Sequence, residues 1–296
     1  MALSHALSLR ERPAGGAVSD RVGELTPPFP QGRRRVVLLV HGYNNTESAA
    51  RRSYDLFAGD LAALGAGGRA ALDDIGGLYW PGDADLGPVS FLSYPLEIAP
   101  AKATAERLAE YLRTLAGPAG TPTEIYFACH SLGNRVLLEL LDLLAAEPAP
   151  LGHVAGAVLM AAAVPVDMVD AGGPLESGAT LPGRTLVLYS RNDRVLHWAF
   201  PLGETAAGEG FFPTAVGRFG QPPGAWTERQ ELAGDDHGDY WADPRAAARV
   251  ARLLGVAVPR EIEAAALAGR KLPAATQVGR RETVTRTTPA RTGFEA

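Results

Sequence analysis

The chain has 296 residues, of which 46% are hydrophobic, a composition typical of a globular protein that buries one large core. Its formal net charge of −5 argues against binding to nucleic acid through overall charge. Cys129 is its single cysteine, which excludes an internal disulfide and a thiolate zinc cluster and suits the reducing cytoplasm. We expect neither a signal peptide nor a membrane span.

The two ends of the chain differ in pattern from its middle. Residues 1–32 are rich in proline and glycine without a sustained hydrophobic period, and this predicts an N-terminal arm outside the domain. Residues 33–256 alternate strand and helix signals and predict one domain. For residues 257–296 we expect a largely disordered tail with one short exposed helix over 259–270.

Continuous apolar runs within the predicted domain indicate strands buried on both faces, and amphipathic stretches between them indicate helices. We interpret the segments 83–95 and 164–182 as loops, and 194–224 as a loop with one short helix. The alternation predicts an α/β fold with a doubly wound, mostly parallel sheet and helices on both faces. The predicted strands are 36–40, 75–80, 124–128, 154–163, 185–189 and 227–232, and the predicted helices are 47–64, 100–115, 135–146 and 244–254.

Ser131 lies where a predicted strand turns sharply into a predicted helix. Such a turn needs small residues two positions before and after the serine, and Cys129 and Gly133 are in those places. Cys129 departs from the usual Gly-x-Ser-x-Gly pattern, but its side chain is also small. Ser131 is therefore a candidate nucleophile, although a serine here could also simply cap the helix.

A serine nucleophile needs a base and a carboxylate that orients the base, and His237 and Asp193 can supply them. Both residues follow predicted strands, so the fold brings them to the edge of the sheet where Ser131 lies. The chain order Ser, Asp, His is that of α/β-hydrolases. The backbone N–H groups of Leu132 and Tyr43 can form the oxyanion hole.

The chain resembles the α/β-hydrolase superfamily, in particular its bacterial esterase- and lipase-like members. The resemblance rests on the segments 40–44, 129–134 and 190–193 and on His237, and it spans roughly residues 35–255. It implies an α/β-hydrolase domain over 33–256. It also implies that Ser131 is the nucleophile and His237 the base. Asp193 is then the acid, and Tyr43 and Leu132 form the oxyanion hole.

Other histidines are weaker candidates for the base. His41 fits a structural role in its His-Gly turn better, and His130 cannot easily fold back onto the serine that follows it. His197 lies close to Asp193 but follows it without an intervening strand. The histidine at 237 therefore remains the preferred base.

Asp167 is an alternative acid, because it follows the preceding strand. Three further carboxylates adjoin the proposed base. We interpret them as a solvated acidic loop, or more weakly as negative charge that favours the protonated imidazole. With one histidine they lack the second cluster that a metal site needs, so no metal is expected. They are Asp235, Asp236 and Asp239.

Aromatic residues occur in or beside the loops predicted to surround the site. If they line a pocket, the substrate carries an apolar acyl or aromatic group, because small-molecule sites are mostly apolar. The candidates for this pocket are Trp80, Tyr94, Trp198, Phe211 and Phe212.

These features together predict a cytoplasmic serine hydrolase that cleaves a small carboxylic ester or related acyl compound through an acyl-enzyme, without a metal or organic cofactor. Two alternatives remain open. One is a catalytically silent α/β-hydrolase that serves as a binding or scaffold module, which the intact Ser, Asp and His disfavour. The other is an acyltransferase that uses the same triad.

Overall fold

The computed structural model of the chain describes most residues of the predicted domain and parts of both ends. The described residues are 3–11, 17–25, 35–65, 74–82, 94–115, 124–147 and 154–272.

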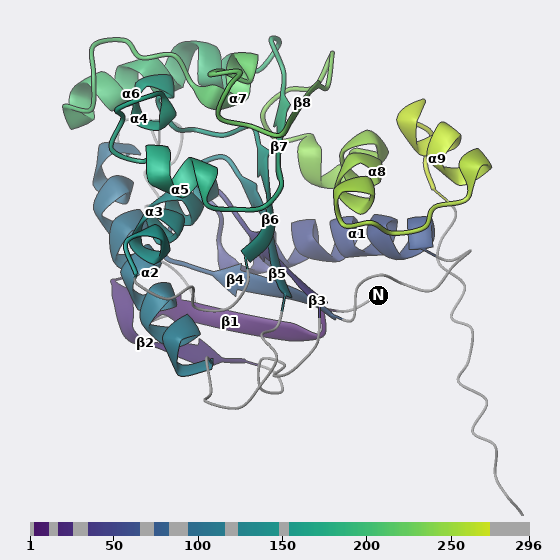
Figure 1. Ribbon diagram of the computed structural model, residues 1–296, viewed down its shortest axis with the longest axis horizontal. Coiled ribbons are helices and arrows are strands. Elements are labelled where there is room, and N and C mark those ends of the chain that lie inside the picture. The colour runs from purple at the N-terminus through teal and green to yellow at the C-terminus, as the bar shows by residue number, and fades with distance from the viewer. Residues whose placement is uncertain are drawn as a thin grey trace, which may run out of the picture.

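Its strands form one eight-stranded sheet with the order β2-β1-β4-β3-β5-β6-β7-β8, and all neighbours are parallel except β1 and β2 (Figure 1). The central strands β3, β5 and β6 are buried over almost their whole length, as expected where helices cover both faces of a sheet. The strands are β1 (His5–Arg10), β2 (Val18–Glu24), β3 (Arg35–Val40), β4 (Asp74–Tyr79), β5 (Glu124–His130), β6 (Val154–Met160), β7 (Thr185–Tyr189) and β8 (Glu228–Glu231).

Two layers of helices enclose this sheet. Figure 1 shows α1, α8 and α9 on one side and α2, α3 and α5 on the other, and within each layer the neighbouring helices pack together. The α/β fold predicted from the sequence is confirmed. The helices are α1 (Glu47–Gly65), α2 (Tyr94–Leu115), α3 (Gly133–Ala145), α4 (Val166–Val169), α5 (Glu176–Thr180), α6 (Phe200–Ala207), α7 (Val216–Phe219), α8 (Pro244–Leu253) and α9 (Arg260–Leu267), with a π-helical turn η2 (Val195–Ala199) and a 3-10 turn η3 (Tyr240–Ala242).

The register of the central strands places the loops that carry chemistry beside one another. Val40, the last residue of β3, pairs with Cys129 near the end of β5. Cys129 in turn pairs with Leu159 near the end of β6. The loops that follow β3, β5 and β6 therefore leave the sheet at the same edge, where α/β proteins bind ligands.

The N-terminal residues contain two strands of the sheet, so the prediction of an arm is wrong for β1 and β2. β1 pairs in parallel with β4, and β2 pairs antiparallel with β1. Leu7 and Leu9 are buried, but so are Ser8 and Arg10, whose guanidinium donates to the carbonyl of Asn45 at 2.7 Å. These buried polar residues hide the strand pattern in the sequence. Residues 12–16 and 26–34 lie outside the described part.

Two predicted loops contain helices. The segment 164–182 carries α4 and α5, and 194–224 carries η2, α6 and α7. α2 also begins at Tyr94, within the predicted loop 83–95, whose residues 83–93 lie outside the described part. The segment 194–224 was predicted to contain one short helix, and the structure has three short helical elements there. Helices this short give little hydrophobic period, so the remaining ones are not predicted from the sequence.

The C-terminal part of the domain ends in a helix that packs on α8. α9 lies in the segment where a short exposed helix was predicted, but Ala266 is fully buried. The last 24 residues of the predicted tail, 273–296, lie outside the described part. Among the described helices, none is long and apolar enough to cross a membrane.

Candidate active site

Ser131 occupies a sharp turn between β5 and α3. Its φ is +53°, a left-handed value that is uncommon for a residue with a side chain. Backbone strain of this kind costs on the order of 1–3 kcal/mol and persists only where the surrounding structure enforces it. Ser131 therefore needs strong local support.

That support comes from a set of hydrogen bonds around the serine backbone. The N–H of Ser131 donates to the carbonyl of Met160 at 3.0 Å. Its carbonyl accepts from the side-chain amide of Asn134 at 2.9 Å and from the N–H of Ala163 at 3.3 Å. The same amide donates to the Met160 carbonyl at 3.0 Å. Asn134, which the sequence analysis did not single out, thus ties the turn to the end of β6.

Two glycines make room for the turn. A Cβ on Gly133 would lie 2.4 Å from the carbonyl oxygen of His41, and a Cβ on Gly42 would lie 2.6 Å from the Cβ of Ser131. Real Cβ atoms do not approach other atoms so closely. The loop after β3 consequently lies directly against the serine, and glycine is required on both sides of this contact.

Ser131, His237 and Asp193 form one hydrogen-bonded chain. Ser131 Oγ lies 2.8 Å from His237 Nε2, and His237 Nδ1 lies 2.8 Å from Asp193 Oδ2. A carboxylate accepts hydrogen bonds, so Asp193 fixes the proton on Nδ1 and leaves Nε2 free to accept from the serine hydroxyl. The structure thus brings together the three side chains that the sequence singled out.

The carboxylate of Asp193 is fully buried and held from both sides. Its second oxygen, Oδ1, accepts from the N–H of Leu196 at 2.9 Å. Asp167, the alternative acid, is exposed on α4, and the His237 ring bonds to Asp193 instead. His197, an alternative base, is exposed, and its ring packs on Trp198 with the ring centroids 4.2 Å apart.

The acidic loop around His237 is tied to arginines. Asp236 accepts from the guanidinium of Arg194 at 2.6 Å, and Arg245 binds the carboxylate of Asp235. Burial, together with the hydrogen bond and negative charge of Asp243, raises the pKa of Asp235 to about 7. These ion pairs orient the loop rather than the imidazole, whose nitrogens bond to the serine and to Asp193.

His130 forms a hydrogen bond to the backbone of the same loop. Its Nε2 lies 2.7 Å from the carbonyl oxygen of His237, and because a carbonyl only accepts, Nε2 carries the proton. Burial and the neighbouring His237 lower the pKa of His130 to about 3, so its ring is neutral at physiological pH. No pattern in the sequence predicts this contact, because it joins residues distant in the chain.

His41 lies in the loop after β3 and serves that loop. Its Nε2 accepts from the N–H of Trp80 at 3.3 Å, its Nδ1 lies 2.8 Å from the carbonyl of Gly42, and its ring stacks on the indole of Trp80. Both nitrogens are therefore committed to the loop, as expected for a structural histidine.

Of the two residues expected to form the oxyanion hole, Leu132 directly follows Ser131 and Tyr43 follows the glycine in contact with it. Leu132 is the N-cap residue of α3, and among the described residues its N–H has no hydrogen-bond acceptor. Tyr43 follows Gly42, the residue in contact with the serine, and its carbonyl accepts from the Asn45 side chain at 2.9 Å. An N–H at a helix N-terminus is well suited to stabilise negative charge.

A family model described as an alpha/beta hydrolase of unknown function (DUF900) matches residues 29–207, more than half of the chain. The chain belongs to this family. The matched span contains Ser131 and Asp193 and ends before His237. A comparison with curated proteins finds no significant match.

Solved structures of esterases and thioesterases are similar to this α/β-hydrolase in fold. An esterase from Pyrobaculum calidifontis is 15% identical, with a TM-score of 0.42 over 78% of this chain and 80% of its own. Carboxyl esterase 2 from the fungus Tuber melanosporum is 14% identical, with a TM-score of 0.42 over 90% and 86%. Acyl-protein thioesterase 2 from Zea mays is 15% identical, with a TM-score of 0.39 over 78% and 97%. Likenesses this distant carry no argument about substrate.

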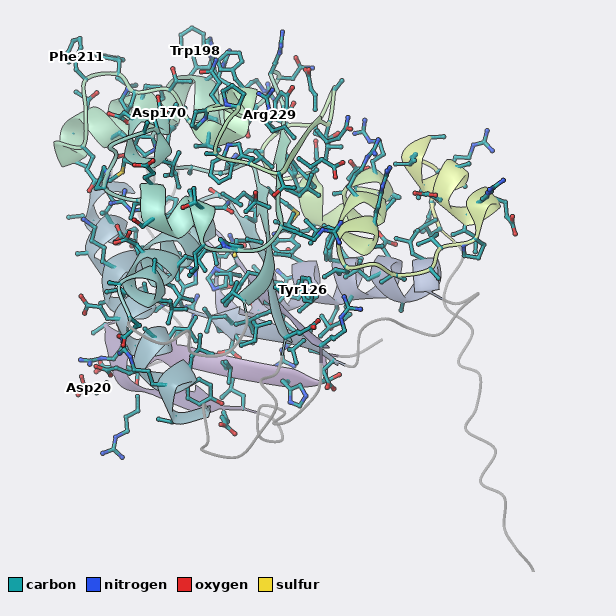
Figure 2. All side chains as sticks on the ribbon, in the orientation of Figure 1. Asp20, Tyr126, Asp170, Trp198, Phe211 and Arg229 are labelled. Carbon is teal, nitrogen blue, oxygen red and sulfur yellow. The ribbon has the colours of Figure 1, made fainter. Side chains whose placement is uncertain are left out.

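The aromatic residues predicted to line a pocket have different environments in this α/β-hydrolase. The prediction that Trp80 lines the pocket is wrong. Its side chain is fully buried against His41, so a substrate entering from solvent does not contact it. Tyr94 begins α2, and its side chain lies outside the described part. Figure 2 shows Trp198 and Phe211 projecting from the end of the molecule that carries α6 and α7.

A surface hollow of about 580 Å³ lies on this end of the α/β-hydrolase. Trp198 and Phe212 line it, whereas Phe211 is 85% exposed and does not. Leu196, which donates its N–H to Asp193, also lines the hollow. The hollow is therefore next to the acid end of the hydrogen-bonded chain.

Proposed function

We propose that this α/β-hydrolase is a serine hydrolase that cleaves a carboxylic ester or a related acyl compound. The observation that carries the proposal is the continuous relay from Ser131 Oγ through His237 to the buried carboxylate of Asp193, with both distances at 2.8 Å. A relay of this geometry is what activates a serine hydroxyl at neutral pH. Its completeness favours turnover over a purely structural role.

The chemistry follows from the proton positions in the relay. Ser131 Oγ attacks the substrate carbonyl carbon while His237 Nε2 accepts its proton, and Asp193 stabilises the resulting imidazolium. The oxyanion is stabilised by the N–H groups of Leu132 and Tyr43. The imidazolium then protonates the departing alcohol, which leaves an acyl group on the serine. Water, deprotonated by His237, attacks this acyl-enzyme; the bond between the acyl carbon and Ser131 Oγ then breaks, the imidazolium returns its proton to Oγ, and the acid is released.

Cys129 does not compete with the serine in this proposal. Burial raises the pKa of its thiol well above its ordinary value, and the side chain lies within β5. A single, buried cysteine also suits a reducing compartment, and we propose the cytoplasm as the place of the reaction.

The test is labelling with a fluorophosphonate probe, which reacts with activated serines. We expect the wild-type protein and a matched Ser177→Ala control to be labelled, since Ser177 is exposed on α5. Ser131→Ala should not be labelled and should lose turnover across esters, thioesters and amides of graded chain length. Labelling of Ser131→Ala at the wild-type rate would contradict the assignment.

A further inference from the structure

The hollow between η2, α6 and α7 is lined by an arginine, one of whose guanidinium nitrogens has no acceptor among the described residues. Arg218 is half-buried and lines the hollow, and its Nη1 is buried without a hydrogen bond to any described group. Its charged group lies over the ring of Phe219, with Cζ 5.0 Å from the ring centroid. A buried donor without an acceptor costs free energy, so it requires an explanation.

Two carboxylates of the candidate site are engaged with other groups. Asp193 accepts from His237 and Leu196, and Oδ2 of Asp236 accepts from both Nε and Nη2 of Arg194. Arg218 is thus paired with neither carboxylate, and the side chains that line the hollow with it are mostly apolar, with His197 and Thr214 as the polar ones.

The remaining lining of the hollow suits an apolar ligand. Trp198 and Leu202 are large apolar residues with exposed fractions of 67% and 49%, and Phe212 adds a second aromatic ring. A volume of about 580 Å³ falls within the range of small-molecule sites. A mostly aromatic and aliphatic wall with one guanidinium, beside which His197 and Thr214 are the other polar side chains, matches a ligand that has an apolar body and one anionic end.

Two sets of backbone hydrogen bonds connect the wall of the hollow to the residues of the relay. Leu196, in its wall, donates to Asp193. Gly217, the neighbour of Arg218, donates to the carbonyl of Ala162, and the next residue, Ala163, donates to the carbonyl of Ser131. The wall of the hollow is therefore connected by backbone hydrogen bonds to the segments that carry Ser131 and Asp193.

We propose that this hollow binds the non-reacting end of the substrate, and that the substrate is an acyl compound whose apolar chain ends in a carboxylate held by Arg218. A guanidinium binds a carboxylate through two parallel hydrogen bonds, and a single arginine matches a single negative charge. This inference rests on the proposed function, because it assigns the substrate class of the same site.

The first experiment measures octanoate binding to the Ser131→Ala protein by isothermal titration, with octanol as the neutral comparison. We expect octanoate to bind more tightly than octanol. Arg218→Gln in the same background should weaken octanoate binding about 10- to 100-fold and leave octanol unchanged. Arg252→Gln, which removes an equal charge at an exposed position of α8, is the matched control and should change neither. Equal binding of octanoate before and after Arg218→Gln would overturn the proposal.

The second experiment uses the wild-type enzyme and a short neutral ester. Octanoate should inhibit turnover competitively, and Arg218→Gln should raise its inhibition constant about 10- to 100-fold, whereas the control Arg252→Gln should leave that constant unchanged. Non-competitive inhibition would overturn the assignment of the hollow to the substrate. Because binding to the Ser131→Ala protein needs no turnover, failure of the proposed function and failure of this inference give different results.

Discussion

Replacing Gly42 with alanine tests the contact between the loop after β3 and Ser131. The added Cβ would lie 2.6 Å from the Cβ of Ser131 and 3.0 Å from the carbonyl oxygen of His130. Carbon atoms in contact are ordinarily about 3.5–4.0 Å apart, so the serine and the loop must separate by roughly 1 Å. Overpacking of this kind costs about 1–3 kcal/mol of stability.

The displacement acts directly on the relay. Ser131 Oγ and His237 Nε2 are 2.8 Å apart, and a hydrogen bond of this kind weakens beyond about 3.2 Å. A misplacement of about 1 Å at a reacting group can lower turnover about 100-fold. We therefore expect Gly42→Ala to remain folded and to lose about 100-fold in kcat/KM for a short ester, with a matching fall in the rate of fluorophosphonate labelling.

Gly59 provides the matched control for this substitution. It lies inside α1, and a Cβ there would meet no atom within 4 Å. Gly59→Ala should leave turnover unchanged and stabilise the helix by about 0.5–1 kcal/mol, which raises Tm by about 1–4 °C. If Gly42→Ala keeps turnover within about twofold of wild type, the loop does not press on the serine in the way we describe.

Three further predictions address the residues around His237. Asp193→Asn should lower kcat about 10⁴-fold in an ester assay, because the amide no longer holds the proton of His237 on Nδ1. Asp167→Asn should keep kcat within about twofold of wild type. The reverse result would show that Asp167 is the acid. His130→Leu should lower kcat about tenfold by leaving the His237 carbonyl without its donor, and His130→Gln should recover much of this. Both variants should keep the wild-type pH profile above pH 5, since His130 is already neutral there, and a shifted profile would contradict the positioning role. For Asp235, the folded pKa of about 7 lies above the unfolded value of about 3.9, so the folded state binds the proton more tightly and stability is lost as pH rises from about 4 to 7. Thermal unfolding should show this loss in wild type and not in Asp235→Asn, and equal pH dependence in the two proteins would refute it.

Much of the fold could be predicted because its central strands are simple in sequence. β3, β6 and β7 are continuous apolar runs, and the helices between them carry clear apolar stripes. β1 was missed because buried Ser8 and Arg10 interrupt its pattern, and Arg10 reaches a partner in a loop that follows another strand. Such a partner is set by tertiary structure, which the local pattern does not contain.

The residues of the candidate site likewise include some that can be predicted from the sequence and some that cannot. Ser131, Asp193 and His237 could be singled out because each follows a strand, and parallel strands end at one edge. Gly42, Asn134 and His130 could not, because their roles depend on contacts with residues that only folding brings near. Trp80 was assigned to a pocket for its position beside a loop, whereas its ring packs under His41. Proximity to a loop in sequence does not decide which way a side chain points.

The cysteine at position 129 can be understood from where the turn is crowded. The Gly-x-Ser-x-Gly pattern has a glycine two positions before and two positions after the serine. In this chain the backbone positions that have no room for a Cβ at the turn are Gly133 and Gly42. Cys129 lies within β5, where it pairs with Val40 of β3 on one side and with Leu159 of β6 on the other. Its side chain is buried in the core. The steric demand of the turn is therefore met by one glycine after the serine and one glycine from the loop after β3. A cysteine before the serine is then compatible with the strained backbone at Ser131, and its departure from the pattern does not weaken the assignment of the nucleophile.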